Sequence, residues 1–340
     1  QRNYATPTRI YTLVHAFASN TSRDPSQRMR RISLMQILPQ RYLSCRIRRP
    51  RAENIAPMDT VYTLPIGDPR RQYIITVRPD AIVDTHRRRA VRVSELTRLL
   101  EPATFILIGE QHDNARHHQF QAQVIEALVQ AGRSVIVGLE MFDRTKQHAL
   151  NLWTLNRLTE SEFIEQSEWR TQWGFDFALY RPIFEAVYRH RLRLVGLNVP
   201  RALVRQTARG GWQSVPESER LGIPDPDLSV EAHRKLFYAL LGGGHPSGQE
   251  QTDNFYAAQV VWDTGMADTA LRYLERTVPS PRLAFVILAG NGHVMYDVGI
   301  SLRLRMRTNL PTRVITLLPP RETPMQARAS IGDIVWLPRA

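Results

Sequence analysis

The sequence predicts an α/β fold of three layers (α/β/α), with helices on both faces of a mainly parallel sheet and helical insertions over the strand ends. Three observations predict it: short apolar runs, helical periodicity between them, and two irregular stretches that interrupt the alternation. Buried parallel strands have nearly continuous apolar runs, and strands that alternate with helices form one sheet with right-handed crossovers. The five runs are residues 104–108, 134–139, 192–197, 283–289 and 313–318.

Helical periodicity marks segments between and before these runs. Residues 119–130 place apolar side chains three and four positions apart, and Gly132 follows as a C-cap. Residues 255–273 have the same spacing, and residues 94–100 form a shorter capped helix. The aromatic side chains within 255–273 are interpreted as packing.

The turn after the first apolar run contains several polar residues. Asp113 or Asn114 is expected to cap the helix that follows, because both side chains accept backbone hydrogen bonds. His112 then lies just before a helix N-terminus, a position that favours a neutral imidazole. His117 and His118 fall in the first helical turn, and one of them is expected to face solvent.

The two irregular stretches are residues 152–176, with three tryptophans, and residues 210–248, rich in glycine and proline. An excursion that carries aromatic side chains over strand ends forms a pocket wall more readily than a second core. Both stretches are therefore expected to cover the strand ends.

The net charge of +13 is concentrated at the N-terminus. Residues 1–51 hold eleven arginines and one acid, Asp24, which leaves 34 bases against 31 acids in the rest. A nearly neutral body argues against a nucleic-acid partner. Residues 1–57 are expected to be a disordered basic tail, since they lack a sustained apolar period, and residues 58–340 a single domain.

Two interpretations of the tail stay open. The segment 29–45, MRRISLMQILPQRYLSC, resembles a lipoprotein signal that ends at Cys45, where a lipid would anchor the chain to a membrane. Its apolar patch is interrupted by polar residues, which favours instead a gene start placed too early. Cys45 is the only cysteine, so the chain alone forms no internal disulfide and no cysteine-rich metal site.

Polar residues follow four of the predicted strands. Because the carboxyl ends of parallel strands lie along one edge of a sheet, these side chains are expected to converge on a ligand site. Buried polar groups need partners or a ligand, so packing alone does not explain them. The residues are Glu110, His112, Glu140, Asn198, Arg201, Asn291 and His293.

The paired Gly-x-x-His turns carry the most specific chemistry. Glu110, His112, Glu140 and His293 are the candidate catalytic residues, because imidazole and carboxylate side chains transfer protons and bind metals. His245 lies in a Gly-rich loop, Gly-Gly-Gly-His-Pro, from which it could reach over the site.

The chain resembles the ChaN-like haem-binding uptake proteins, within the superfamily that includes the Tiki and TraB proteins and the erythromycin esterases. The resemblance covers roughly residues 80–318, in the same order. The matching stretches are Gly109-Glu110-Gln111-His112-Asp113-Asn114 with His117-His118, Glu140-Met141-Phe142-Asp143, Tyr180-Arg181-Pro182-Ile183, Asn198-Val199-Pro200-Arg201, Ala258-Gln259 with Asp263 and Met266-Ala267, and Gly290-Asn291-Gly292-His293.

The resemblance implies a haem-binding homodimer of the bacterial envelope, in iron uptake or storage, with a tyrosine as iron ligand. Tyr180 and Tyr296 are the candidate ligands, and Asn198, Arg201 and His245 are expected to contact the cofactor. The insertion 153–177 would supply the apolar slot. The poor signal segment leaves a cytoplasmic location open.

Hydrolytic relatives in the superfamily imply an alternative, a metal-dependent peptide or ester hydrolase. His112, Glu140 and His293 would hold a divalent metal in this case. Without a metal, His112 or a glutamate would act as general base. The sequence has neither a His-Glu-x-x-His helix nor a Gly-x-Ser-x-Gly elbow, which excludes the better-known protease and esterase motifs.

Overall fold

An eight-stranded sheet runs through the protein, in a computed structural model that describes residues 58–241 and 249–340. The predicted tail with Cys45, and the loop that holds His245, lie outside these residues. The order of the sheet is β3-β2-β10-β8-β4-β7-β5-β6. Its strands are β2 (Ile82–Asp84), β3 (Arg89–Val91), β4 (Phe105–Ile108), β5 (Ser134–Asp143), β6 (Arg193–Asn198), β7 (Leu283–Leu288), β8 (Thr312–Leu317) and β10 (Ile334–Trp336).

The five strands predicted from apolar runs are β4 to β8, and they are parallel to their neighbours in the sheet. β10 extends this parallel part beside β8, while the hairpin β2–β3 is antiparallel to it. A separate antiparallel pair forms from β1 (Ile74–Val77) and β9 (Met325–Arg328). The predicted α/β class and mainly parallel sheet are confirmed.

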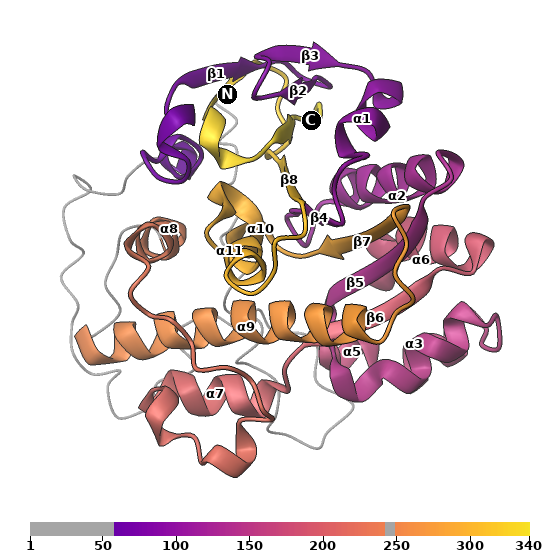
Figure 1. Ribbon diagram of the computed structural model, residues 1–340, viewed down its shortest axis with the longest axis vertical. Helices are drawn as coiled ribbons and strands as arrows, with labels where there is room; N and C mark the ends of the chain where they lie inside the picture. The colour runs from indigo at the N-terminus through magenta and orange to yellow at the C-terminus, as the bar shows by residue number, and fades with distance from the viewer. Residues whose placement is uncertain (1–57, 242–248) are drawn as a thin grey trace, which may run out of the picture.

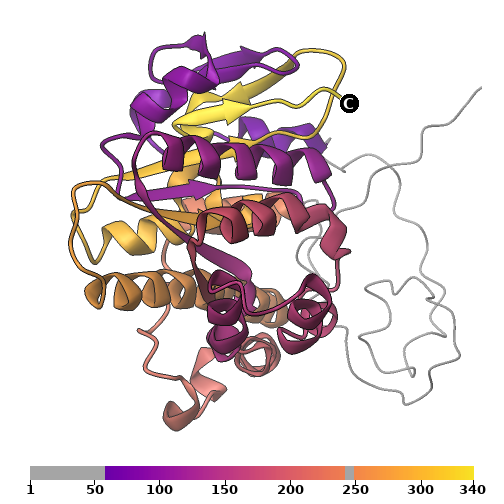
Figure 2. The same ribbon diagram turned by 90° about the vertical axis from the view of Figure 1, so that its right-hand side faces the viewer.

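Helices cover both faces of the sheet, as Figures 1 and 2 show. The core on one face packs the sheet against α1, α2 and α6, and the core on the other face packs it against α7, α9 and α11. The helices are α1 (Val93–Leu100), α2 (Ala115–Gln130), α3 (Gln147–Thr154), α4 (Glu160–Gln166), α5 (Trp169–Gln172), α6 (Phe177–His190), α7 (Arg201–Gly210), α8 (Glu231–Leu240), α9 (Gln249–Glu275), α10 (Asn291–Val294) and α11 (Ile300–Arg305).

Short 3-10 turns connect these elements and shape the ends of the sheet. No helix among the described residues is long and apolar enough to cross a membrane. The turns are Met58–Thr63, Pro69–Arg71, Arg144–Lys146, Trp212–Ser214, Glu217–Glu219, Met295–Asp297 and Ala329–Ile331.

The beginning of α2 follows from its sequence. The Asn114 side chain accepts hydrogen bonds from the backbone N–H groups of Arg116 and His117, so Asn114 rather than Asp113 is the N-cap. The expectation that His117 or His118 faces solvent is wrong, because both side chains are fully buried. The helix turns this polar end towards the strand ends and not towards water.

The predicted insertions have different roles. Residues 152–176 fold mainly into α3, α4 and α5 and supply part of the pocket described below. The stretch 210–248 includes α8, which its composition did not indicate, and none of its described residues lines that pocket. Its glycines and prolines surround a short amphipathic helix, and α8 instead contributes a buried histidine behind the pocket.

Candidate functional site

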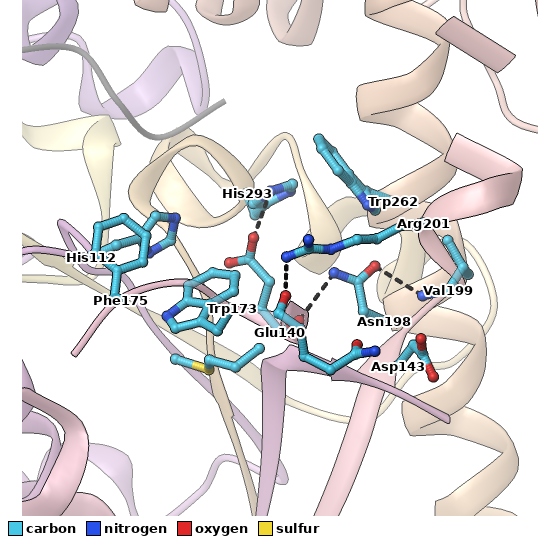
Figure 3. Close-up of a pocket in the computed structure, with 12 residues that line it drawn as sticks. His112, Glu140, Asp143, Trp173, Phe175, Asn198, Val199, Arg201, Trp262 and His293 are labelled. Carbon is cyan, nitrogen blue, oxygen red and sulfur yellow. Dashed lines mark hydrogen bonds and ion pairs between the residues drawn. The ribbon is translucent and has the colours of Figure 1, made fainter. Parts of the chain in front are cut away.

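A pocket opens at the carboxyl ends of the central strands, where the sequence predicted it (Figure 3). Its enclosed volume is about 40 Å³, room for about three water molecules. Glu140 lies within β5, Asn198 ends β6, and His112 and His293 follow β4 and β7. The lining residues are His112, Glu140, Met141, Asp143, Gln172, Trp173, Phe175, Asn198, Val199, Arg201, Trp262 and His293.

The first polar pair in the pocket is Glu110 with His112. Nδ1 of His112 donates to Oε1 of Glu110 over 2.8 Å, and both side chains are almost completely buried. No residue that the structure describes bonds to the other ring nitrogen, Nε2 of His112. A carboxylate that fixes the ring and the tautomer in this way leaves Nε2 as a proton acceptor or a metal ligand.

Glu110 is held by several donors at once. The Tyr180 hydroxyl donates to its Oε1 over 2.7 Å, and the Gln121 amide donates to its Oε2 over 3.0 Å. His118 lies 3.6 Å from Oε1. Burial alone would raise the pKa of Glu110, but the neighbouring His118 and His112 hold this pKa well below its usual range. The carboxylate therefore stays ionised and keeps the His112 ring in place.

The second polar pair is Glu140 with His293. Nε2 of His293 lies 3.3 Å from Oε1 of Glu140, and the Gly290 N–H donates to Oε2 over 2.6 Å. The Glu140 backbone carbonyl accepts from the Asn198 amide over 3.0 Å, which fixes Asn198 at the pocket wall. Despite its burial, the charge of His293 keeps the pKa of Glu140 low.

Three buried residues continue this pair away from the pocket. Nδ1 of His293 donates to Asp263 over 2.6 Å, and Nε2 of His233 lies 3.0 Å from the other carboxylate oxygen. The Arg303 guanidinium lies 3.2 Å from Nδ1 of His233. The chain Glu140–His293–Asp263–His233 thus alternates acids with histidines, ends at Arg303, and joins β5, α10, α9, α8 and α11.

The charges of this chain follow from its geometry. Burial disfavours a charged imidazole, but the two carboxylates on either side raise the pKa of His293 to about 10. His293 is therefore protonated on both nitrogens at neutral pH. Burial lowers the pKa of His233. His233 is thus a neutral imidazole that accepts from Arg303, with its other nitrogen facing Asp263.

Two close contacts tie the two pairs together. The backbone N–H of Asn291 donates to the backbone carbonyl of Glu110 over 2.9 Å. The side-chain amide of Asn291 donates to the Leu317 carbonyl over 2.8 Å. Gly109 faces the Asn291 amide oxygen so closely that a Cβ there would lie 2.1 Å from it. Gly109 is thus needed for a close contact inside the protein.

One wall of the pocket is aromatic. Trp173 and Phe175, from the turn between α5 and α6, are half-buried and pack against the His112 ring, with ring centroids at 4.5 and 5.4 Å. Figure 3 shows the Arg201 guanidinium pointing into the same space, where it donates to the Thr171 carbonyl over 2.8 Å. An aromatic face beside a cation suits an apolar ligand with acidic groups.

The two candidate tyrosines lie in different places. Tyr180 is fully buried beneath the pocket, and its hydroxyl also approaches the His112 carbonyl at 3.2 Å. Burial and the charge of Glu110 raise the pKa of Tyr180 well above its usual value, so the hydroxyl is neutral. Tyr296 belongs to a separate core cluster and donates to the Val61 carbonyl over 2.7 Å. Neither tyrosine lines the pocket.

The predicted divalent-metal ligands do not form a metal centre among the described residues. His112, Glu140 and His293 line one pocket, but residues 58–241 and 249–340 contain no group of three or more His, Cys, Asp or Glu placed to hold a metal ion. His293 instead lies between Glu140 and Asp263, and Oε2 of Glu140 accepts from the Gly290 N–H.

The residues behind the two pairs were not predicted from the sequence. They are Gln121, His118 and His233, together with Asp263, which the family resemblance alone contains. One signal was present: polar residues at 259 and 263 interrupt the apolar stripe of α9, and both are buried. A buried acid on a packing face needs a partner, which is His293 here.

The matching family model, described as haem-binding uptake, Tiki superfamily, ChaN, covers residues 96–304. That range spans more than half of the chain and includes both Glu–His pairs. The chain belongs to this ChaN family. ChaN of Campylobacter jejuni is 21% identical, with a TM-score of 0.59 over 75% of this chain and 95% of that one, and it has the same fold.

A mutant of the erythromycin esterase EreC in its open conformation is more distant from this ChaN family member. It is 16% identical, with a TM-score of 0.41 over 72% of this chain and 76% of that one. No protein with curated function matches the chain.

Proposed function

We propose that this ChaN family member binds haem and serves in iron acquisition or storage. The observation that carries the proposal is the family match over residues 96–304, which spans the whole candidate site. The structure of the Campylobacter jejuni relative is described as cofacial haem binding to ChaN. Cofacial means that two porphyrins lie face to face. We therefore propose the predicted homodimer together with haem binding.

Two features of the pocket support haem binding at its mouth rather than inside it. A cavity of about 40 Å³ is far below the roughly 300–1,000 Å³ of sites that enclose small molecules, so the porphyrin would be held outside it. Trp173 and Phe175 are partly exposed there and offer apolar faces. Haem supplies the redox and ligand chemistry of iron, and the protein sets these through the axial ligand.

His112 is the residue that we propose presents a donor atom to the iron. Its Nε2 has no partner among the described residues, whereas the Tyr180 hydroxyl already donates to Glu110 and is neutral. Glu110 on the far side of the ring would strengthen the imidazole as a ligand. In the haem-bound protein, His112 would bind the iron, Glu110 would orient the His112 ring, and Trp173 and Phe175 would exclude water from the site.

A ferric haem titration of the protein, followed by absorbance, tests the function. We expect a saturable spectral shift near one haem per chain, and a changed spectrum with weaker binding in His112→Ala. His148→Ala is the matched control, because His148 is exposed on α3 and lies outside the pocket lining. Absence of a saturable shift in the wild-type protein would rule out haem binding.

The predicted dimer and envelope location call for separate measurements. Sedimentation with and without haem gives the oligomeric state, and a sedimentation coefficient that stays monomeric in both contradicts the dimer. Labelling with a lipid precursor, compared between the natural chain and Cys45→Ser, tests the anchor. Cell fractionation of the natural chain decides between the envelope and the cytoplasm.

One observation favours a second candidate function, hydrolysis without a metal. Two imidazoles, each oriented by a carboxylate, face a cavity of the size of a few water molecules. His112, through Nε2, would take a proton from water, which then attacks an ester or amide carbonyl. The positive charge of His293 would stabilise the oxyanion that forms.

Hydrolysis of model ester and peptide substrates by chelator-treated protein tests this candidate. Loss of turnover in His112→Ala and in His293→Ala, with turnover kept in His148→Ala, would support it. Equal turnover in all three variants would show that the two pairs do no hydrolysis.

A further inference from the structure

A row of arginines on α7 starts at the pocket. Arg201, Arg205 and Arg209 are spaced four residues apart, so they lie along one side of the helix. Arg201 is half-buried, lines the pocket and donates to the carbonyls of Thr171 and Gln172, next to the aromatic wall. Arg209, at the other end of the helix, is exposed. The row therefore leads outwards from the aromatic wall.

The two outer arginines lack side-chain partners in the part of the chain that the structure describes. Arg205 and Arg209 form no hydrogen bond or ion pair with residues 58–241 or 249–340. Burial is the larger cause that lowers the pKa of Arg201, and the positive charge of Arg205 lowers it further. The negative charge of Asp143 acts in the opposite direction and raises this pKa. Like charges four residues apart destabilise a helix, so a bound anion beside this row would stabilise it.

The outer arginines also border a hollow on the surface of α7. Its volume is about 610 Å³, which lies within the range of small-molecule sites. Four of its six lining residues have polar side chains and two of these are arginines, so an anionic group can find donors there. The lining residues are Ala202, Arg205, Gln206, Arg209, Gly210 and Ser214.

We propose that Arg205 and Arg209 bind the two propionate carboxylates of a haem whose porphyrin rests on Trp173 and Phe175. This inference depends on the proposed haem-binding function. A guanidinium and a carboxylate pair through two parallel hydrogen bonds, and two carboxylates on one ligand match two unpaired guanidinium groups. Arg201, held by backbone carbonyls, fixes the first turn of α7 against the aromatic wall.

Titrations with ferric haem and with its dimethyl ester separate the carboxylates from the ring. The wild-type protein should bind the diacid more tightly than the ester. The double variant R205Q/R209Q should bind the diacid roughly tenfold more weakly and the ester as tightly as the wild type does. Circular dichroism of each variant verifies that it is folded.

The control R98Q/R157Q removes two exposed arginines that line neither cavity. It should bind both ligands like the wild type, and a matching loss in this control would mean that net charge alone acts. Unchanged diacid binding in R205Q/R209Q, or equal loss for both ligands, overturns the inference. If the wild-type protein binds haem and its dimethyl ester equally well, the arginine inference is overturned but haem binding stands. If it binds neither form, the proposed haem-binding function is refuted.

Discussion

Nδ1 of His293 lies 2.6 Å from Asp263, on the side of the ring opposite Glu140. The imidazole therefore stands between two buried carboxylates, a surrounding that stabilises its protonated form. The other histidine of the pocket, His112, has one such partner, Glu110, and an unshared second nitrogen. Two histidines in similar sequence turns thus have different numbers of carboxylate partners.

Stability should fall with alkaline pH because of His293. Its pKa is raised to about 10 in the folded protein, from about 6.5 in the unfolded chain. Its contribution is complete below pH 6.5 and is lost as the pH rises through 10, because the folded state binds the extra proton in this window. We expect the free energy of unfolding, from urea titrations, to drop by up to about 5 kcal/mol between these limits.

Asp263→Asn should reduce this pH dependence. The variant removes one of the two carboxylates, so His293 should lose its proton at lower pH, and stability at pH 7 should fall by about 3–5 kcal/mol. Asp268→Asn is the control: Asp268 is buried on the same helix but pairs with Arg144, Arg272 and Arg307, which do not titrate in this range. An unchanged slope in Asp263→Asn would contradict the assignment.

Gly299→Ala should destabilise the protein through the backbone beneath His293. A Cβ at position 299 would lie 2.1 Å from the His293 carbonyl oxygen, so backbone has to move, and we expect a loss of about 3 kcal/mol. At Gly292 the Cβ would meet the end of a flexible side chain, Leu240, at 3.1 Å. Gly292→Ala should therefore cost less, about 1 kcal/mol. Equal losses in denaturant titrations would be inconsistent with this contact.

Tyr180→Phe should separate positioning from iron binding. The change removes a hydroxyl that donates to Glu110, which should cost about 1.5–3 kcal/mol of stability and weaken haem binding by loosening His112. The absorbance spectrum of bound ferric haem should keep its wild-type bands, whereas His112→Ala should change them. A spectrum lost in Tyr180→Phe but kept in His112→Ala would make Tyr180 the ligand. Tyr188→Phe, at an exposed position, is the control.

Asn114→Ala should weaken the start of α2. Its side chain satisfies two backbone N–H groups, so its removal should cost about 1 kcal/mol. Asp113→Ala changes an exposed neighbour that is not the N-cap and should have little effect. Thermal unfolding of both variants measures the difference, and a larger loss in Asp113→Ala would reverse the assignment of the cap.

The parallel half of the sheet could be predicted because its strands are buried on both faces. A run such as 283–289 contains no polar residue, and a buried parallel strand requires none. The strands at the other edge are three residues long, and β3 is mostly exposed, so they leave no comparable pattern. Their place is set by pairing between distant parts of the chain.

The candidate site was predictable where its residues follow a strand directly. Glu140 follows the predicted run 134–139, although β5 extends past it to Asp143, and His293 follows β7 by five residues; both were found because strand ends meet at one edge of the sheet. His233 lies on a separate helix and reaches Asp263 only through tertiary packing. The expected exposure of His117 or His118 was wrong because both side chains have partners or packing inside, His117 at the Leu318 carbonyl and His118 beside Tyr180.

β10 pairs with β8 on one side and with β2 on the other, so residues 334–336 join the hairpin β2–β3 to the sheet. During synthesis the hairpin is made more than two hundred residues before this strand. Until β10 is made, the edge of β2 stays unpaired, and an unpaired strand edge is prone to aggregation and chaperone binding. Closure over so long a loop is slow. A chain that stops before residue 334 would therefore contain the residues of both Glu–His pairs but would lack the strand that joins the hairpin β2–β3 to the sheet.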